Sequence, residues 1–285
     1  MPNKYYKLTI PVTSEEEKET TIGMLHLLSD FESIQEEDTH IIVSYNASIQ
    51  DQDELVQSIK ESGFISDYEI EAIENKNWNE IYEKSFEPIR ILNNKWGVRA
   101  SFHHPLDVEK EIVIDPKMSF GTGHHETTKQ MMELMDGENF IDKNVFDYGS
   151  GTGILAIMAK IKGAHAVKAI DNEDWAYNNS LENAVINSVE SIQFHCGDIS
   201  MSESDGFLNS TQDQFDIIIA NITKNILIQS APKINEYAKE NSLLFLSGFY
   251  ESDVQDLLSI YEPYGYSLLK TSVEKNWTCL KLIKN

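Results

Sequence analysis

A glycine-rich segment between two apolar runs constrains the fold of this chain more than any other feature. Residues 147–153 read Asp-Tyr-Gly-Ser-Gly-Thr-Gly, follow the apolar pair Val145-Phe146 and lead into the mostly apolar run 154–160. A turn this tight requires glycine, because positive φ and close backbone approach exclude a Cβ. A helix that begins behind the turn offers unpaired N–H groups and the positive end of its dipole. The sequence therefore predicts a strand, a ligand-binding turn and a helix in succession.

The spacing of the glycines narrows the kind of ligand. The loop has the pattern Gly-x-Gly-x-Gly, and position 154, where a dinucleotide fingerprint needs a small residue, is isoleucine. In this respect the loop resembles the S-adenosylmethionine (SAM) loop of class I methyltransferases more than the loop of a nicotinamide-binding protein.

The sequence after residue 142 predicts an α/β domain with a parallel sheet covered on both faces, because strand-like and helix-like stretches alternate. Helices are expected to begin near residues 154, 174, 225 and 252. The expected strands are 144–147, 166–171, 191–196, 215–220 and 242–247. Two further strand-like stretches, 266–271 and 277–283, are close enough to form a terminal antiparallel hairpin. A Rossmann-like sheet that ends in such a hairpin is typical of class I methyltransferases.

Residues 1–74 form a separate unit with its own pattern. Helices are expected from residue 14 and over 51–60, and strands over 4–12, 33–38, 39–45 and 68–73. The order β-α-β-β-α-β predicts a small α+β domain of the ferredoxin-like kind. This unit contains 17 acidic and 4 basic residues, so about half of the chain's net charge of −24 lies in it. The acidic surface is either a solvated face or a docking surface for a basic protein.

A connection and a small β segment are expected between the two units. Residues 75–88 read as a short polar helical linker that Pro88 ends. Within the larger domain, 89–285, which is expected to be the SAM-binding one, residues 89–140 are expected to form a β entry and a loop that covers the cofactor. The short strands of this entry are predicted over 89–92, 95–101 and 111–114.

Charge and composition argue against several classes of protein. A surface with a net charge of −24 repels phosphate backbones, which argues against a nucleic-acid partner. No apolar run approaches the roughly 20 residues that span a bilayer. The first residues lack a secretory pattern, so a cytoplasmic protein without membrane contact is expected. Cys196 and Cys279 are too few for a disulfide framework, and the adjacent His124 and His125 fit no zinc signature. No metal is expected, and a monomer is the default.

Polar side chains are expected to contact the ligand where the predicted strands end, because ligands of open α/β sheets lie outside the carboxyl ends of the strands. Gly149, Gly151 and Gly153 would bring the loop backbone close to the methionine moiety of SAM. Asp147 could receive the SAM ammonium group through water, or it could orient the loop.

The next three strand ends each supply one polar side chain. Asp171 could accept both ribose hydroxyls, or it could cap the helix that follows. Asp198 could accept the adenine amino group, or it could be a turn residue. Asn221 would lie beside the sulfonium, where its amide oxygen could orient an attacking amine, and it is the predicted catalytic residue.

A second glycine-containing run, 120–123, precedes the helix in which several methionines lie on the apolar positions. Its glycines permit a tight loop over bound cofactor, so Phe120, Gly121 and Thr122 are predicted cofactor contacts. Thr128, at the start of the helix, could cap it or bond a carboxylate.

Three motifs resemble those of the PrmA family, the methyltransferases of ribosomal protein L11. They are Phe120-Gly121-Thr122-Gly123-His124-x-x-Thr127-Thr128, Asp147-x-Gly149-x-Gly151-x-Gly153-Ile154-Leu155-Ala156 and Asn221-Ile222. The similarity spans the chain, and the first motif is specific where the glycine loop alone is not. The chain departs from the family pattern at 124–128, where the family often has Thr-His-Pro-Thr-Thr, and at Thr223, where leucine or valine is common.

The resemblance implies a role for each unit. The N-terminal domain would recognise L11, free rather than on the ribosome, and the linker would let that domain move. The larger domain would methylate lysine ε-amino groups and the N-terminal α-amino group with SAM as donor. By resemblance, the SAM contacts fall on Thr128, Gly149, Asp171 and Asn221.

The sequence is also compatible with other functions. The chain could methylate another protein or a small molecule, or it could bind SAM without catalysis. A nicotinamide dehydrogenase is disfavoured by Ile154 and by the terminal hairpin. Methyl transfer needs a neutral amine, and no residue of the sequence stands out as a general base.

Overall fold

The chain consists of two compact units, Met1–Ser85 and Phe86–Asn285, each with its own apolar core. The computed structural model describes residues 5–14, 17–18, 20–22, 25, 33–37, 39–46, 52–62, 65, 67–73, 87–115, 117, 119–199 and 206–285. The predicted linker helix over 75–88 lies outside these residues, apart from 87 and 88.

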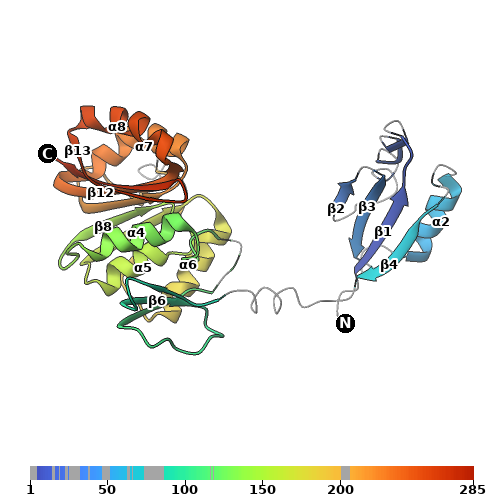
Figure 1. The fold of residues 1–285 in the computed structure, drawn as a ribbon, viewed down its shortest axis with the longest axis horizontal. Coiled ribbons are helices and arrows are strands. Elements are labelled where there is room, and N and C mark those ends of the chain that lie inside the picture. Colours follow the sequence, from blue (N-terminus) through green and yellow to red (C-terminus); the bar gives the residue numbers. More distant parts are fainter. Residues whose placement is uncertain are drawn as a thin grey trace. The chain divides into compact units, whose positions relative to one another are not determined.

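The smaller unit contains a four-stranded antiparallel sheet in the order β2-β3-β1-β4. Its described elements are β1 (Tyr5–Pro11), β2 (Ser33–Glu36), β3 (His40–Asn46), α2 (Gln52–Ser62) and β4 (Glu69–Ile73). Helix α2 lies along one face of the sheet (Figure 1). Alternate residues of β1 and β3 point to that face, and there Leu8, Ile10, Ile41 and Val43 are buried with the helix residue Leu55.

The predicted strands and second helix of this unit are present in the predicted order. The first helix is described only at residues 17–18, 20–22 and 25. The ferredoxin-like assignment of the whole unit therefore stays a prediction.

The larger unit is built on a seven-stranded sheet in the order β10-β9-β8-β11-β12-β14-β13. Five strands are parallel, and the last two form an antiparallel hairpin at one edge. The strands are β8 (Asn144–Tyr148), β9 (Ala166–Asp171), β10 (Ile192–Cys196), β11 (Phe215–Asn221), β12 (Ala238–Tyr250), β13 (Tyr266–Glu274) and β14 (Trp277–Lys284). The α/β fold class and the terminal hairpin are confirmed.

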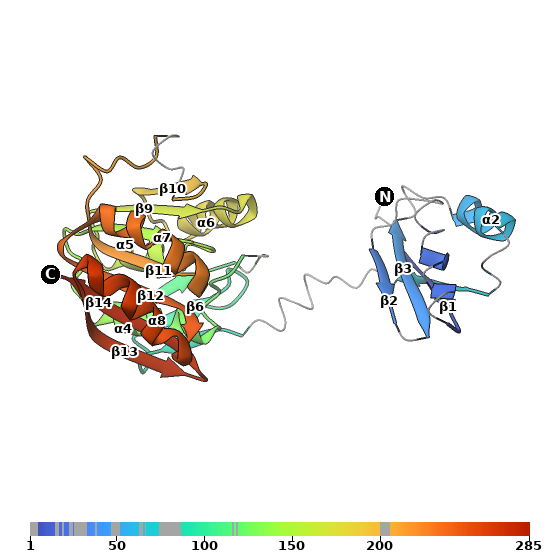
Figure 2. The same cartoon turned by 90° about the horizontal axis from the view of Figure 1, so that it is seen from above.

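Helices cover both faces of this sheet (Figures 1 and 2). Neighbouring strand residues point to opposite faces, so Val145 and Ile217 pack with α4 and α5 whereas Phe146 and Ile218 pack with α7 and α8. The helices are α4 (Glu126–Asp136), α5 (Ile154–Ile161), α6 (Asp174–Ile186), α7 (Lys224–Tyr237) and α8 (Val254–Tyr261), with short 3₁₀ turns at Glu251–Asp253 and Glu262–Tyr264.

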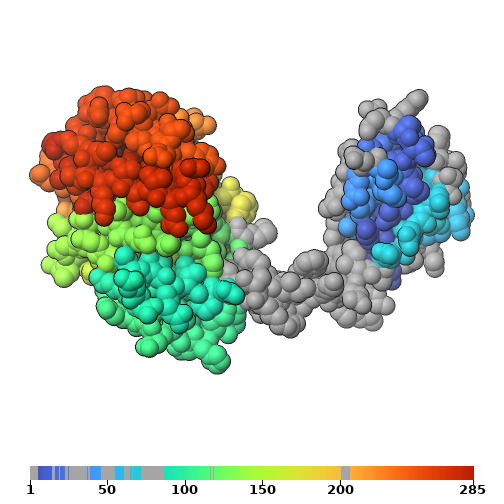
Figure 3. Space-filling view, viewed as in Figure 1, coloured from blue at the N-terminus to red at the C-terminus, as the bar shows by residue number. Residues whose placement is uncertain are grey.

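A small three-stranded sheet precedes this domain, in the order β5-β6-β7. Its strands are β5 (Ile89–Ile91), β6 (Trp96–Arg99) and β7 (Lys110–Val113). Trp96, Val98 and Ile112 are fully buried in the same cluster as α4 and α5. In the space-filling view this segment packs directly against the body of the unit (Figure 3), so the predicted β entry is part of its core.

Several elements differ from the prediction by a few residues, and the two differences that follow concern β12 and α4. Strand β12 begins at Ala238, four residues earlier than expected, because α7 runs into it without a loop. Helix α4 is capped by His125, whose ring nitrogen accepts the Thr127 N–H, and Thr128 lies inside the first turn. Among the described helices, none combines the length and the apolar character that crossing a membrane requires.

Candidate functional site

Two adjoining cavities lie at the carboxyl ends of the parallel strands, where the strand order reverses between β8 and β11. The larger has a volume of about 410 Å³ and the smaller about 240 Å³. They form one groove, because they share the lining residues Gly149, Asp171, Asn172, Ile222 and Ile226. The groove crosses the sheet from the end of β10 to the start of β14. Its size is that of a site for a cofactor and part of a substrate.

The glycine loop forms the floor between the two cavities. Gly149 and Gly151 have φ values of 76° and 54°, in the left-handed region. A Cβ on Gly149 would lie 2.1 Å from Ile222 Cγ2, and one on Gly151 would lie 2.3 Å from the Phe120 carbonyl oxygen. Both positions therefore require glycine for space as well as for conformation.

The run that begins at Phe120 is fastened to the glycine loop by hydrogen bonds from one residue. The Thr152 N–H donates to the Phe120 carbonyl (2.9 Å), and its hydroxyl donates to the Gly121 carbonyl (2.5 Å). Phe120 is 52 % exposed and lines the larger cavity. The loop thus places an aromatic ring at the rim of the site.

Asp171 holds the glycine loop from the end of β9. One of its carboxylate oxygens accepts the Gly151 N–H at 2.8 Å, and the other accepts the Glu173 N–H at 3.1 Å. A carboxylate offers about four acceptor positions, so two remain for a ligand. Asp171 lines both cavities and lies at their junction.

Asp147 is buried beneath the loop. Only 1 % of it is exposed, and among the described residues neither carboxylate oxygen has a hydrogen-bond partner at good geometry. The pKa of Asp147 is raised to about 7, mainly by burial; the Ala156 N–H opposes this rise and the charge of Asp171 adds to it. Asp147 lines neither cavity.

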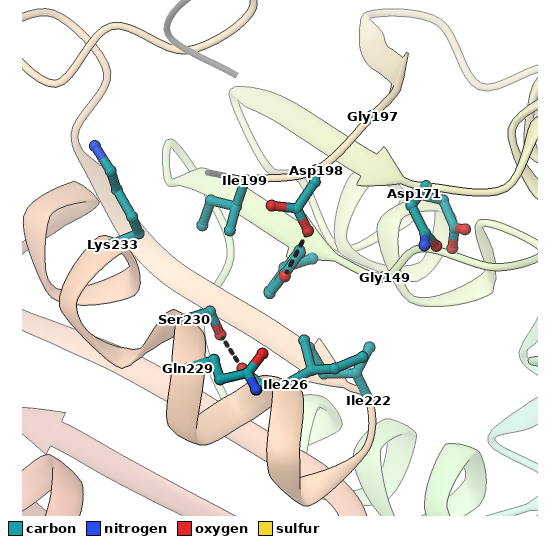
Figure 4. Close-up of a pocket in the computed structure, with 12 residues that line it drawn as sticks. Gly149, Asp171, Gly197, Asp198, Ile199, Ile222, Ile226, Gln229, Ser230 and Lys233 are labelled. Atoms are coloured by element: carbon teal, nitrogen blue, oxygen red, sulfur yellow. Dashed lines mark hydrogen bonds between the residues drawn. The ribbon is translucent and has the colours of Figure 1, made fainter. Parts of the chain in front are cut away.

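Asp198 lines the smaller cavity (Figure 4). The Tyr148 hydroxyl donates to its carboxylate at 3.4 Å, shown by the dashed line. Burial, together with the charge of Asp198, raises the pKa of Tyr148, so this hydroxyl stays a donor at neutral pH. In Figure 4, Gly197, Asp198 and Ile199 lie on one wall and the α7 residues on the opposite one. The smaller cavity has the polar and apolar sides that a purine base needs.

Asn221 ends β11 at the boundary of the larger cavity. Its amide nitrogen donates to the Thr128 hydroxyl at 3.4 Å. Its carbonyl oxygen is buried and has no hydrogen-bond partner among the described residues. Asn221 therefore has an acceptor without a partner at the wall of the larger cavity, and Thr128 contacts Asn221 without lining the cavity itself.

Aromatic residues form part of the lining of the larger cavity. The His125 ring lies edge-on between Phe120 and Trp277, with ring centroids 5.2 and 4.9 Å away. Trp277 also packs on Tyr250 at 4.3 Å. Trp175, which is 50 % exposed, lines the cavity from the first turn of α6.

Several predicted site residues meet in the groove, and others do not line it. Those that line it are Phe120, Gly149, Gly151, Asp171, Asp198 and Asn221. Those that line neither cavity are Gly121, Thr122, Thr128, Asp147 and Gly153. Sequence reasoning missed Trp175 and Trp277 as lining residues. The signal at Trp277 was a large aromatic residue directly after the predicted hairpin turn.

The charge of the lining favours a cationic ligand. Asp171 and Glu173 line the larger cavity, and within the described part of the chain no lysine or arginine does. Among the same residues no group of three or more His, Cys, Asp or Glu is arranged to hold a metal ion.

Comparison with known proteins agrees with this geometry. The family model described as Ribosomal protein L11 methyltransferase (PrmA) matches residues 8–285. A protein of that name from Porphyromonas gingivalis is 38 % identical over 257 residues, 88 % of this chain and 86 % of the relative. One from Wolinella succinogenes is 32 % identical over 297 aligned positions, 99 % of this chain and 98 % of the relative.

A solved structure supports the fold. The ribosomal protein L11 methylase of Lactobacillus delbrueckii subsp. bulgaricus superposes with a TM-score of 0.60 at 24 % identity, covering 69 % of this chain and 98 % of that one. The family match over nearly the whole chain and the relatives above 30 % identity are decisive: this chain belongs to the ribosomal protein L11 methyltransferase (PrmA) family, whose members are SAM-dependent enzymes.

Proposed function

We propose that this protein transfers methyl groups from SAM to lysine ε-amino groups and the N-terminal α-amino group of ribosomal protein L11. The observation that carries the proposal is the groove itself. It combines an acidic, glycine-floored part with an aromatic-lined part, and Asn221, which lines the larger cavity, has a carbonyl oxygen without a hydrogen-bond partner among the described residues.

The residues present fit SAM. Its sulfonium and ammonium groups are cationic, and the larger cavity is lined by two carboxylates, with no lysine or arginine among the described residues. Asp171 has acceptor positions for ribose hydroxyls, and Asp198 with Ile199 offers a polar edge and an apolar face to adenine. The positive end of the α5 dipole would favour the carboxylate. When bound, SAM supplies an electrophilic methyl group.

The other half of the site would hold the attacking amine. A lysine amine must be neutral to attack, and its ordinary pKa is about 10.4. Desolvation among Phe120, His125 and Trp277 lowers that pKa by disfavouring the charged form. The Asn221 carbonyl oxygen would accept an N–H of the amine and point its lone pair along the line of displacement. The chain would thus promote methyl transfer by positioning the amine, and it would not need a dedicated general base.

The smaller unit would recognise the protein substrate. We assign recognition to residues 1–74, the linker to 75–88 and catalysis to 89–285. The acidity of the first segment, 17 acidic against 4 basic residues, supports a basic partner. We further propose that L11 is modified free of the ribosome, by a monomer in the cytoplasm. The net charge of −24, which would repel ribosomal RNA, supports the choice of free L11.

Intact-mass spectrometry of purified L11, after incubation with the protein and SAM, tests the proposal. Gains in steps of about 14 Da, one per methyl group, are expected. An unchanged mass, with SAM binding verified by calorimetry, would keep the fold and the cofactor but reject L11 as the substrate.

A further inference from the structure

The turn of the β13–β14 hairpin lies against the first turns of α4, and charged residues of both elements pair there. Lys275 Nζ lies 2.5 Å from Glu126 Oε1. Lys129 Nζ lies 3.4 Å from both carboxylate oxygens of Glu274. The two pairs alternate in sign, since each element contributes one acid and one base. The hairpin turn is therefore paired with α4 at two positions.

A third contact links the same elements beside Trp277. The Gln130 side-chain nitrogen donates to the Trp277 backbone carbonyl at 3.1 Å. Gln130 is 1 % exposed, so this hydrogen bond is shielded from water. Glu126, Lys129 and Gln130 lie on one face of α4, because positions i, i+3 and i+4 are neighbours on a helix.

The turn is a two-residue connection whose backbone is unusual for its sequence. Lys275 and Asn276 have φ values of 49° and 70°, and Glu274 pairs directly with Trp277. Such a turn normally uses Asn-Gly or Asp-Gly. A lysine is disfavoured at positive φ, and here its ammonium group is held by Glu126. The ion pair between Lys275 and Glu126 of α4 therefore occurs at the turn residue with an unfavourable φ, two positions before β14 begins at Trp277.

Trp277, the first residue after the turn, is the part of the hairpin that lines the site. Its ring packs on Tyr250 and on the edge of His125, which caps α4, and it lines the larger cavity together with Asn221. A shift of the turn along α4 would carry the ring out of the wall beside the amine.

We propose that the ion pairs Glu126–Lys275 and Lys129–Glu274 form a latch that positions Trp277 over the amine half of the cavity. The four charged residues are positioning residues, because they act through Trp277 and do not line the cavity. The inference deepens the proposed function and rests on it for the identity of the amine.

Charge reversal tests the latch. Glu126→Lys and Lys275→Glu should each place like charges against each other and lower kcat/KM for L11 by about tenfold, while Kd for SAM changes less than about twofold. The double reversal restores the pair with opposite polarity and should recover most of the activity. Lys270→Glu, an exposed reversal on the same hairpin, is the matched control and should leave kcat/KM unchanged. Thermal unfolding of each variant verifies the fold.

A second readout does not depend on L11. Fluorine NMR of protein labelled with 5-fluorotryptophan gives a signal for each of the four tryptophans, and Trp277→Phe identifies the relevant one. The Trp277 signal should move or broaden in each single reversal and return in the double reversal.

An unmoved Trp277 signal, or a double reversal no better than the single ones, would overturn the latch. If the signal behaves as expected but the wild-type protein fails to methylate L11, the proposed substrate is wrong and the latch stands.

Discussion

At the scale of single residues, the pH response of the larger unit depends on Asp147. Its pKa is about 7 in the fold against 3.8 as the ordinary value, because burial disfavours the charged carboxylate. The folded state therefore binds this proton more tightly. The stability that the neutral carboxyl supports is fully present below about pH 4 and is lost as pH rises through 7.

Asp147→Asn should remove this loss, since an amide does not titrate. Without cofactor, the Tm of the wild type should fall relative to the Tm of the variant between pH 4 and 7, with a constant difference above that range. Calorimetric scans across pH measure the difference, and Asp107→Asn, at an exposed position, is the control. Parallel profiles for wild type and Asp147→Asn would show that the carboxyl is not neutral in the fold.

A substitution at Gly151 tests the contact between the glycine loop, residues 149–153, and the run that begins at Phe120. Gly151→Ala must displace the Phe120 carbonyl, 2.3 Å from the new Cβ, and should destabilise the fold by about 1–3 kcal/mol and weaken SAM binding. Gly206→Ala is a matched control, because its φ of 80° gives a similar backbone penalty with no described atom within 4 Å. Calorimetric titration should give a higher Kd for SAM with Gly151→Ala than with Gly206→Ala. Equal Kd values would contradict a role for the contact between the two loops in SAM binding.

At the scale of elements, α6 fixes the entry segment and the glycine loop through asparagines. Asn183, fully buried, donates to the Thr152 carbonyl at 2.9 Å and accepts the Asp115 N–H at 3.0 Å. One turn later, Asn187 exchanges two hydrogen bonds with Val113. These hydrogen bonds explain why a buried face of the helix carries asparagines. Their amides pair with backbone N–H and C=O groups of neighbouring segments that have no partner in a sheet at these positions.

Asn183→Leu should leave the Thr152 carbonyl and the Asp115 N–H unpaired. The free energy of unfolding should fall by about 2–4 kcal/mol as a result. Asn178→Leu, on the exposed face of the same helix, controls for the loss of an amide. Urea denaturation monitored by circular dichroism measures both, and an equally small effect of the two substitutions would refute this role of Asn183.

Local pattern was enough to predict most of the elements and six of the residues that line the groove, because period-2 and helical repeats and glycine spacing are local signals. Asp171, Asp198 and Asn221 were found because every parallel strand ends at the same edge. The contacts that depend on distant pairing were not found. Trp277 reaches the site only through a hairpin that packs on α4, almost 150 positions away in sequence, and no local pattern encodes that.

At the scale of the whole molecule, the two units are expected to divide recognition from chemistry. A chain of residues 86–285 keeps the complete groove and both of its surrounding cores. It should bind SAM with Kd within about threefold of the full-length value and lose most activity on L11, because the acidic unit is missing. Calorimetry and methylation assays measure the two properties, and full activity of the shorter chain would assign recognition to the larger unit.

The most direct test of the account compares the intact mass of L11 after incubation with SAM and the wild type, Asn221→Ala or Asp171→Ala, at limiting and saturating SAM. The wild type should add methyl groups in steps of about 14 Da. Asp171→Ala should approach that pattern only at saturating SAM, whereas Asn221→Ala should stay slow at any SAM concentration because the amine is unheld. Wild-type turnover by Asn221→Ala would contradict the assignment of this groove as the place where the amine is held for methyl transfer.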